Sequence, residues 1–535
     1  MIRSPIANAS PRGFDRPALA AALLILVASA MDLARLARFA LLGWDTYPLI
    51  LTSGGSVSAV FANFTQPLMH GLYPSDFYRP VLNLTFAFDR ALWGLSPFGY
   101  HLTTIVLFAA CAAALWHLLR TLSRGGAPDA RGAWIGPLAG LLVFLLHYTH
   151  YEVLPVPSRR AEILCGLFLA LALATQLRAS RAWLPVVFAV LAYLSKETAF
   201  VLPALIFVAV LLYAPQRNAS ERMRHALRAC LPHAIALAAV LAIRLAVLGG
   251  IGGHKESSLA GALGRLPVYT AGMFKWALFP QEAMQKSPVA PWLLVIACAG
   301  IAACAFAAGT AAASAGRARA GTGSKRSSER LAPAAPAMDG RKPGLFAIAW
   351  LLAMAGAYSL AAEMSPWYML LPVMGLAMLC SAIAQLAVQG ASADERIPAA
   401  RGWRAAAVIG AVPLAALLLW QASYSPLVRA YPEWSDASRV AREFLEVTHE
   451  QIAEAPEGAL LEGGPMPTWV RPRAGATAHP RVYGAAIFAE YSVQAWAQLV
   501  FPSRAIAVKV APTLSHAKAP PDGVLLVFTK NLPGY

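Results

Sequence analysis

The sequence contains a succession of apolar runs with the length of membrane-spanning helices. A helix needs about 20 predominantly apolar residues to cross the hydrocarbon core of a bilayer. The run at 182–214 is too long for one helix, and Ser195-Lys196-Glu197 interrupts it, so we divide it in two. The sequence then predicts about eleven spans, at 17–41, 98–119, 134–151, 161–177, 182–195, 198–214, 229–249, 289–309, 344–361, 367–389 and 405–422. We therefore expect an all-α polytopic membrane protein.

The charges of the sequence follow the same pattern. Only 13% of the residues are charged, whereas soluble domains carry about 25%. The net charge is +17, and the basic residues gather at the N-terminus and in every second connection between apolar runs. Because Lys and Arg are retained on the cytoplasmic side of membrane proteins, we expect a cytoplasmic N-terminus and an external C-terminus. The excess charge thus indicates topology and not nucleic-acid binding.

Residue usage also bears on the compartment. All six cysteines fall inside apolar segments, which argues against disulfides and Cys-based metal sites. The basic segment before the first apolar run predicts a retained first helix in preference to a cleaved signal peptide. Few lysines beside many arginines and alanines are typical of a GC-rich bacterial genome, so we expect a bacterial inner (plasma) membrane.

Two regions are predicted, a membrane region at 1–422 and an external, periplasmic soluble domain at 423–535. The membrane region contains a long external loop at 42–97. It also contains a loop at 310–343, rich in Ala, Gly, Ser and Pro, that predicts a disordered cytoplasmic segment. Residues 266–279 have the pattern of an amphipathic helix that lies on the membrane surface.

The predicted external domain opens on a helical pattern at 437–455. Strand-like runs follow at 506–510 and 524–528. Since a helix and separate strands share one short region, we expect a small α/β fold, and no tetratricopeptide or other repeat is present.

An acidic residue stands where the first predicted span ends. Asp45 lies in Gly43-Trp44-Asp45-Thr46-Tyr47, and aromatic residues favour the membrane–water boundary. A carboxylate held there is a candidate general base, and the alternative is a helix cap or a solvated loop acid. Asp32, Arg35 and Arg38 share one face of the first span, so we expect them to pair with one another or to face the bundle interior.

Three sequence blocks resemble those of a known family in their order and spacing. They are Phe77-Tyr78-Arg79-Pro80-Val81 with Leu92-Trp93-Gly94-Leu95 and Pro97-Phe98-Gly99-Tyr100-His101-Leu102; His147-Tyr148-Thr149-His150-Tyr151-Glu152 with Ser158, Arg160, Glu162 and Leu164; and Leu194-Ser195-Lys196-Glu197-Thr198 with Leu202-Pro203. The chain is similar here to a branch of the GT-C glycosyltransferases that includes the protein O-mannosyltransferases with transmembrane and tetratricopeptide repeats. The resemblance covers roughly residues 40–214 and, more weakly, Ser365-Pro366-Trp367-Tyr368.

This resemblance implies a sugar donor linked to a polyprenyl phosphate, used at the external membrane face. It also implies an acid of the first external loop as base, and Asp45 is the matching position. The chain departs from the family in three ways: Thr46 follows Asp45 where paired acids are frequent, Tyr148 replaces the usual Pro after His147, and the repeats are absent. The first departure argues against an acid pair that bridges a metal ion, so we expect no metal or other cofactor.

Further candidate residues follow from the needs of phosphate chemistry. Arg forms bidentate bonds with phosphate and Lys offers a point charge, which stabilises a leaving phosphate. The donor phosphate-binding candidates are Arg79, Arg159, Arg160 and Lys196. Residues expected to be substrate-binding or structural are Tyr78, His101, His147, Glu152 and Glu197. Each cation also has a simpler interpretation, as an anchor to lipid headgroups or as half of a structural ion pair.

The predicted function is glycosyl transfer with inversion from a polyprenyl-phosphate-linked sugar to a glycan, lipid or protein acceptor. A transporter or flippase of lipid-linked sugars also needs a cationic external cavity, but transporters commonly show inverted repeats, and we find none here. A non-catalytic membrane scaffold that acts through the C-terminal domain is the third alternative. The expected partners are the lipid-linked sugar, membrane lipids and the acceptor.

Overall fold

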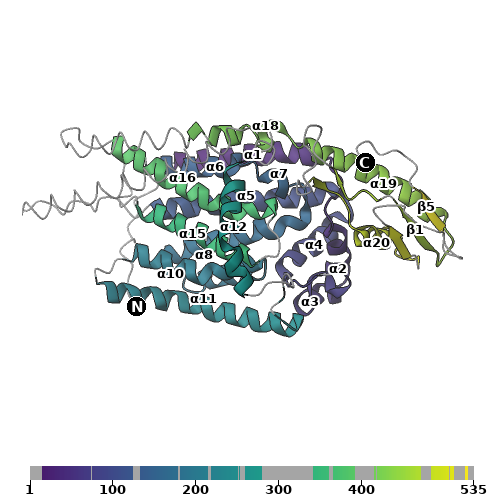
Figure 1. Cartoon of the computed structure of the whole chain (residues 1–535), viewed down its shortest axis with the longest axis horizontal. Coiled ribbons are helices and arrows are strands. Elements are labelled where there is room, and N and C mark those ends of the chain that lie inside the picture. The colour runs from purple at the N-terminus through teal and green to yellow at the C-terminus, as the bar shows by residue number, and fades with distance from the viewer. Residues whose placement is uncertain are drawn as a thin grey trace, which may run out of the picture.

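The structure is a computed structural model that describes residues 15–73, 75–123, 133–178, 181–214, 218–250, 252, 259–279, 341–360, 365–391, 415–416, 418–464, 466–470, 484–504, 507–510 and 524–527. Its long helices lie side by side in one bundle, and the strands lie beyond one end of it (Figure 1). The chain is a polytopic helical membrane protein, as predicted, with a small α/β region near its C-terminus.

Five helices in the described part of the chain are long and apolar enough to cross a membrane, judged by length and composition. They are α1 (Arg16–Leu36), α5 (Pro97–Ser123), α8 (Arg160–Leu177), α11 (Ala219–Leu248) and α16 (Leu370–Ala391). Shorter apolar helices are α6 (Ile135–Leu146), α9 (Leu184–Tyr193) and α10 (Leu202–Tyr213). A further helix of the bundle is α15 (Arg341–Ser359). One-turn helices are α7 (His150–Val153), η2 (Pro157–Arg159), η3 (Glu197–Val201) and η4 (Pro366–Met369). The predicted span at 289–309 and most of that at 405–422 lie outside the described residues, so the number of spans stays a prediction.

Glycines let two of these helices approach closely. A Cβ atom at Gly140 of α6 would lie 2.5 Å from the carbonyl oxygen of Ala377 in α16, and one at Gly136 would lie 2.5 Å from that of Ser381. Membrane helices associate through such small residues because lipid offers them little hydrophobic driving force. These two positions therefore fix how α6 packs on α16.

The segment predicted as the first external loop is largely helical. It contains α2 (Thr46–Ser53), α3 (Val57–Thr65), η1 (Leu68–Gly71) and α4 (Pro80–Trp93). Arg90 of α4 donates through Nη1 to the carbonyl oxygens of Ile50, Leu51 and Gly54, at 3.1, 2.8 and 2.9 Å. Because the last carbonyls of a helix have no partner within it, this arginine closes the end of α2. The segment is thereby a rigid platform at one end of the bundle (Figure 1).

The C-terminal region has the predicted helix and strands. It contains α18 (Pro426–Arg429), α19 (Pro432–Glu454), β1 (Leu460–Gly464), β2 (Trp469–Val470), β3 (Ala485–Ala486), α20 (Glu490–Val500), β4 (Ala507–Val510) and β5 (Val524–Val527). The strands β4, β1 and β5 form a parallel sheet in that order, and β2 pairs with β3 antiparallel. The helix and strands predicted at 437–455, 506–510 and 524–528 are thus confirmed, although α19 begins earlier than expected.

The first span is bonded to this region. The Tyr431 hydroxyl donates to Asp32 Oδ1 at 2.8 Å, and Arg35 Nη2 donates to the carbonyl of Leu427 at 3.0 Å. Beyond the end of α1, the backbone N–H of Ala40 donates to Ser438 Oγ at 2.8 Å. Asp32 and Arg35 therefore bind the segment just before α19. The sequence predicted that they pair with one another or face the bundle interior.

A helix forms where the amphipathic pattern was found. It is α12 (Leu259–Leu278), which begins earlier than the predicted start at 266. Its buried residues include Tyr269 and Met273. In Figure 1 it runs across the direction of the long helices. Its position on a membrane surface stays a prediction.

Candidate functional site

Asp45 occupies the N-cap position of α2, yet its side chain makes no capping hydrogen bond. Its Oδ1 instead accepts a hydrogen bond from the Tyr491 hydroxyl of α20 at 2.8 Å. The helix-cap alternative for this acid is therefore not what the structure shows. The carboxylate is half-buried and faces the C-terminal region.

The C-terminal region also fixes the backbone on either side of Asp45. The N–H of Gly43 donates to the carbonyl of Ile487 at 3.1 Å, and Ser492 Oγ donates to the carbonyl of Trp44 at 2.5 Å. Gly43 has φ +96°, and a Cβ there would overlap Val156 Cγ1. Glycine is required at this position because other residues rarely adopt positive φ and the space is filled. The acid is thus presented by a turn with little freedom.

The surroundings of Asp45 act on its pKa in both directions. Burial raises the pKa above its ordinary value and is the largest effect. The hydrogen bond from Tyr491 and the positive charges of Arg79 and Arg159 oppose it. A raised pKa makes the ionised carboxylate a stronger base, which suits the abstraction of a proton from a hydroxyl.

Arg159, the last residue of η2, is one of the two cations that act on Asp45. Its Nη1 is 3.2 Å from Glu152 Oε2, and its guanidinium stands 4.1 Å from the ring centre of Trp367 and 5.4 Å from that of Trp434. A cation over an aromatic face is held by the ring quadrupole. The predicted site residues Arg159 and Glu152 are therefore together, beside two tryptophans from distant segments.

A second ion-pair group is centred on Glu197. Its Oε2 accepts from Arg79 Nη2 at 2.8 Å and Nε at 3.1 Å, and its Oε1 accepts from Arg244 Nη1 at 2.8 Å. The neighbouring Lys196 pairs with Glu162, and its Nζ is 4.4 Å from the ring centre of Tyr368. Lys196 and Glu197 thus each pair with residues that are distant in the chain.

Arg160 differs from the other predicted phosphate-binding cations. It is 0% exposed, and its Nη1 is 2.6 Å from Asp89 Oδ2. Its Nε donates to Thr104 Oγ1 at 2.8 Å, and its guanidinium carbon lies 5.0 Å from the ring centre of Phe86. A fully buried and neutralised guanidinium holds helices together, so the prediction that Arg160 binds a donor phosphate does not fit this structure.

Three further candidates have structural contacts away from Asp45. The Tyr78 hydroxyl donates to the carbonyl of Phe64 at 2.9 Å. His101 is buried, with Nε2 3.4 Å from the carbonyl oxygen of Ala40. His147 is also buried, with Nε2 2.8 Å from the carbonyl oxygen of Ala277 in α12. Of the two interpretations offered for them, substrate-binding or structural, these contacts favour the structural one.

Sequence reasoning missed Tyr491 and Arg244. Tyr491 is 446 residues from Asp45 in the chain, and nothing in its local sequence marks it. Arg244 carried a usable signal, because a charge inside an apolar helix is rare without a partner or a function. Among the described residues no group of three or more His, Cys, Asp and Glu side chains is placed to hold a metal ion, and metal independence stays a prediction.

Comparison with known proteins gives one sequence match. No protein-family model matches the chain. Over 96 residues, 18% of this chain, it is 33% identical to Protein O-mannosyl-transferase tmtc2 of Xenopus laevis, and the match spans only 10% of that protein. The match agrees with the resemblance to the GT-C glycosyltransferases that the three blocks predicted.

The structure also has solved neighbours. It is similar to ArnT from Cupriavidus metallidurans bound to undecaprenyl phosphate, with a TM-score of 0.41 and 12% identity over 91% of this chain and 89% of that one. It is also similar to ArnT from Cupriavidus metallidurans in the apo state, with a TM-score of 0.34 and 13% identity over 82% and 81% of the two chains.

Proposed function

We propose that this protein is a GT-C-type glycosyltransferase. It moves a monosaccharide from a polyprenyl-phosphate-linked donor to a glycan, lipid or protein acceptor, at the external face of a bacterial inner membrane. The observation that carries this proposal is the convergence of the resembling blocks around one acid. Arg79 of the first block pairs with Glu197 of the third at 2.8 Å, and Lys196 of the third pairs with Glu162 of the second. The positive charges of Arg79 and of Arg159, beside the second block, also lower the pKa of Asp45.

The reaction needs a base and a stabilised leaving group. Asp45 accepts the proton of the acceptor hydroxyl as its oxygen attacks the anomeric carbon of the sugar. The bond from that carbon to the phosphate oxygen breaks, and its electron pair stays on the departing lipid phosphate. A single displacement inverts the anomeric centre and uses no enzyme nucleophile.

Arg79, Arg159 and Lys196 stabilise the negative charge that develops on the departing phosphate. Arg79 donates to Glu197 through Nε and Nη2, and Arg159 donates to Glu152 through Nη1. Other N–H groups of both guanidinium ions have no partner recorded among the described residues, and Arg can use them to bind phosphate. Their carboxylate partners keep the cations in place before the donor arrives.

The test compares the purified full-length protein with its Asp45→Asn variant on a panel of labelled polyprenyl-phosphate monosaccharides. The asparagine amide keeps an oxygen that can accept the Tyr491 hydrogen bond, so the variant removes the base and keeps the contact. Loss of a general base lowers the rate by about 10²–10⁴-fold, and we expect this loss in Asp45→Asn. The control is Asp436→Asn, the same substitution in α19, which should leave the rate unchanged.

Normal turnover by Asp45→Asn at equal protein level would refute the assignment of the base. No turnover by either protein, with the lipid changing leaflet in vesicles, would favour the transporter alternative. We also expect turnover to survive a chelator; its loss, restored by added divalent ions, would contradict metal independence.

A further inference from the structure

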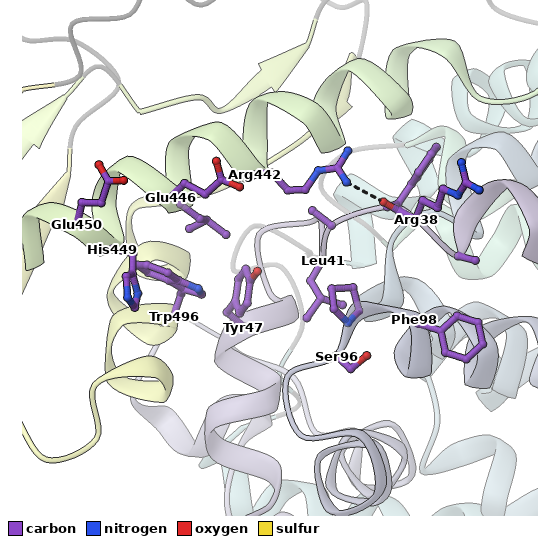
Figure 2. A pocket seen from close by; sticks show the side chains of 15 residues that line it. Arg38, Leu41, Tyr47, Ser96, Phe98, Arg442, Glu446, His449, Glu450 and Trp496 are labelled. Atoms are coloured by element: carbon purple, nitrogen blue, oxygen red, sulfur yellow. Dashed lines mark hydrogen bonds between the residues drawn. The ribbon is translucent and has the colours of Figure 1, made fainter. Parts of the chain in front are cut away.

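A cavity lies where the C-terminal region meets the end of the bundle, apart from Asp45. Its volume is about 560 Å³. One wall is the segment that follows α1 and the start of α5, including Arg38, Leu41 and Phe98. The opposite wall is α19 with Trp496 of α20 (Figure 2). The walls belong to the ends of two candidate spans and to the C-terminal region, so the cavity stands at the boundary between them.

The charges along this cavity are ordered. Arg442, Glu446 and Glu450 are spaced four residues apart on α19, and all three line the cavity. Residues at this spacing share one helix face and follow one another at about 6 Å. Since α19 runs from the bundle toward the strands (Figure 1), the basic end is the one near the bundle. Arg38 lies at the same end (Figure 2).

The two arginines at the basic end have no acidic partner recorded among the described residues. Arg442 Nη1 donates to the carbonyl oxygen of Arg38 at 3.3 Å, and both side chains are exposed. Arg439 on the same helix is the contrast, because it stands 3.2 Å from Glu443 and 3.9 Å from Asp436. The cavity therefore presents two guanidinium groups that are available to an anion.

Several of the residues that line the cavity are apolar. Leu41, Leu445, Trp496 and Phe98 all line it, and Phe98 is 44% exposed in the first turn of α5. An apolar path that reaches the rim of two membrane spans suits an acyl chain, whereas a soluble anion gains nothing from it.

We propose that this cavity binds a phospholipid whose headgroup carries a phosphate followed by an amine, as in phosphatidylethanolamine. The phosphate lies on Arg38 and Arg442, the ammonium reaches Glu446 one helical turn farther on, and an acyl chain follows Phe98. A wholly anionic headgroup would meet the same arginines but would face Glu446 and Glu450 with no positive charge. The bound lipid joins the C-terminal region to the membrane, and the proposal is independent of glycosyl transfer.

The test uses the full-length protein purified from vesicles of equal parts phosphatidylethanolamine and phosphatidylglycerol. Native mass spectrometry measures which lipid stays bound. We expect the wild type to retain phosphatidylethanolamine in preference, and the Arg38→Gln/Arg442→Gln variant to retain at least about tenfold less, because two charge-assisted bonds are lost. Glu446→Gln should keep binding lipid but lose the preference over phosphatidylglycerol. Arg439→Gln, the matched control on the same helix, should behave as the wild type.

The proposal fails if the double variant retains phosphatidylethanolamine as the wild type does, or if Arg439→Gln loses as much. It also fails if Glu446→Gln keeps the full preference, since the amine would then have no partner. A further arm adds soluble phosphoethanolamine during purification. If phosphoethanolamine at the same molarity as the lipid displaced it, the headgroup alone would account for binding, and the lipid assignment would be wrong.

Discussion

Removal of one hydroxyl, by Tyr491→Phe, isolates the effect of the C-terminal region on Asp45. The hydroxyl donates to the carboxylate at 2.8 Å and thereby favours its ionised form. A hydrogen bond to a charged group contributes about 1.5–3 kcal/mol, and one pKa unit corresponds to about 1.4 kcal/mol. Because the carboxylate is only half-buried, we take the lower end of this range. The loss of the bond raises the pKa of Asp45 further above its ordinary value.

If ionised Asp45 is the base, the acid limb of the kcat profile moves to higher pH by about one unit in Tyr491→Phe. Above that limb, kcat returns close to the wild-type value, because a more basic carboxylate remains in place. The assay is sugar transfer from the lipid-linked donor across the pH range, with kcat and KM measured separately. A loss of kcat that is equal at every pH, with the limb unmoved, would contradict this effect on Asp45 and would mean that Tyr491 only stabilises the fold.

Three other substitutions test the site. Asp45→Asn should be more stable to heat than the wild type at pH 7, and this difference should vanish in acid. A carboxylate whose folded-state pKa is raised stabilises the fold at low pH and loses that contribution as pH rises. An equal difference in thermal stability at both pH values would contradict this prediction. Arg160→Gln should lower the stability by about 3–5 kcal/mol, measured by thermal unfolding, because Asp89 is left buried without its partner. Arg159→Gln changes a neighbour whose side chain is 10% exposed, and it should weaken donor binding and raise KM with a smaller change in stability. The reverse ranking of the two stability changes would contradict the structural role given to Arg160.

Much of the fold is predictable because it is local. The apolar runs that became α1, α5, α8, α11 and α16 are long, and in a bilayer only a helix satisfies their backbone groups internally. The sequence predicts a loop at 42–97 because α2 and α3 have only 8 and 9 residues, too few for a clear hydrophobic period.

The candidate site is predictable only in part. The blocks mark Asp45, Arg79 and Arg159, but they do not say which way a side chain points. They therefore predict the same role for Arg160 and Arg159, although the two side chains face different surroundings. Tyr491 is beyond any local pattern, because the contact with Asp45 depends on how a helix 446 residues away docks.

The bonds between α1 and the C-terminal region also constrain the order of biosynthesis. Asp32 and Arg35 enter the membrane with α1, whereas their partners Tyr431 and Leu427 are translated about 400 residues later. Elongation proceeds at about 5–20 residues per second, so α1 waits some tens of seconds for its final neighbours. A nascent chain halted before α19 would be inserted but would lack the surface that completes the Asp45 turn.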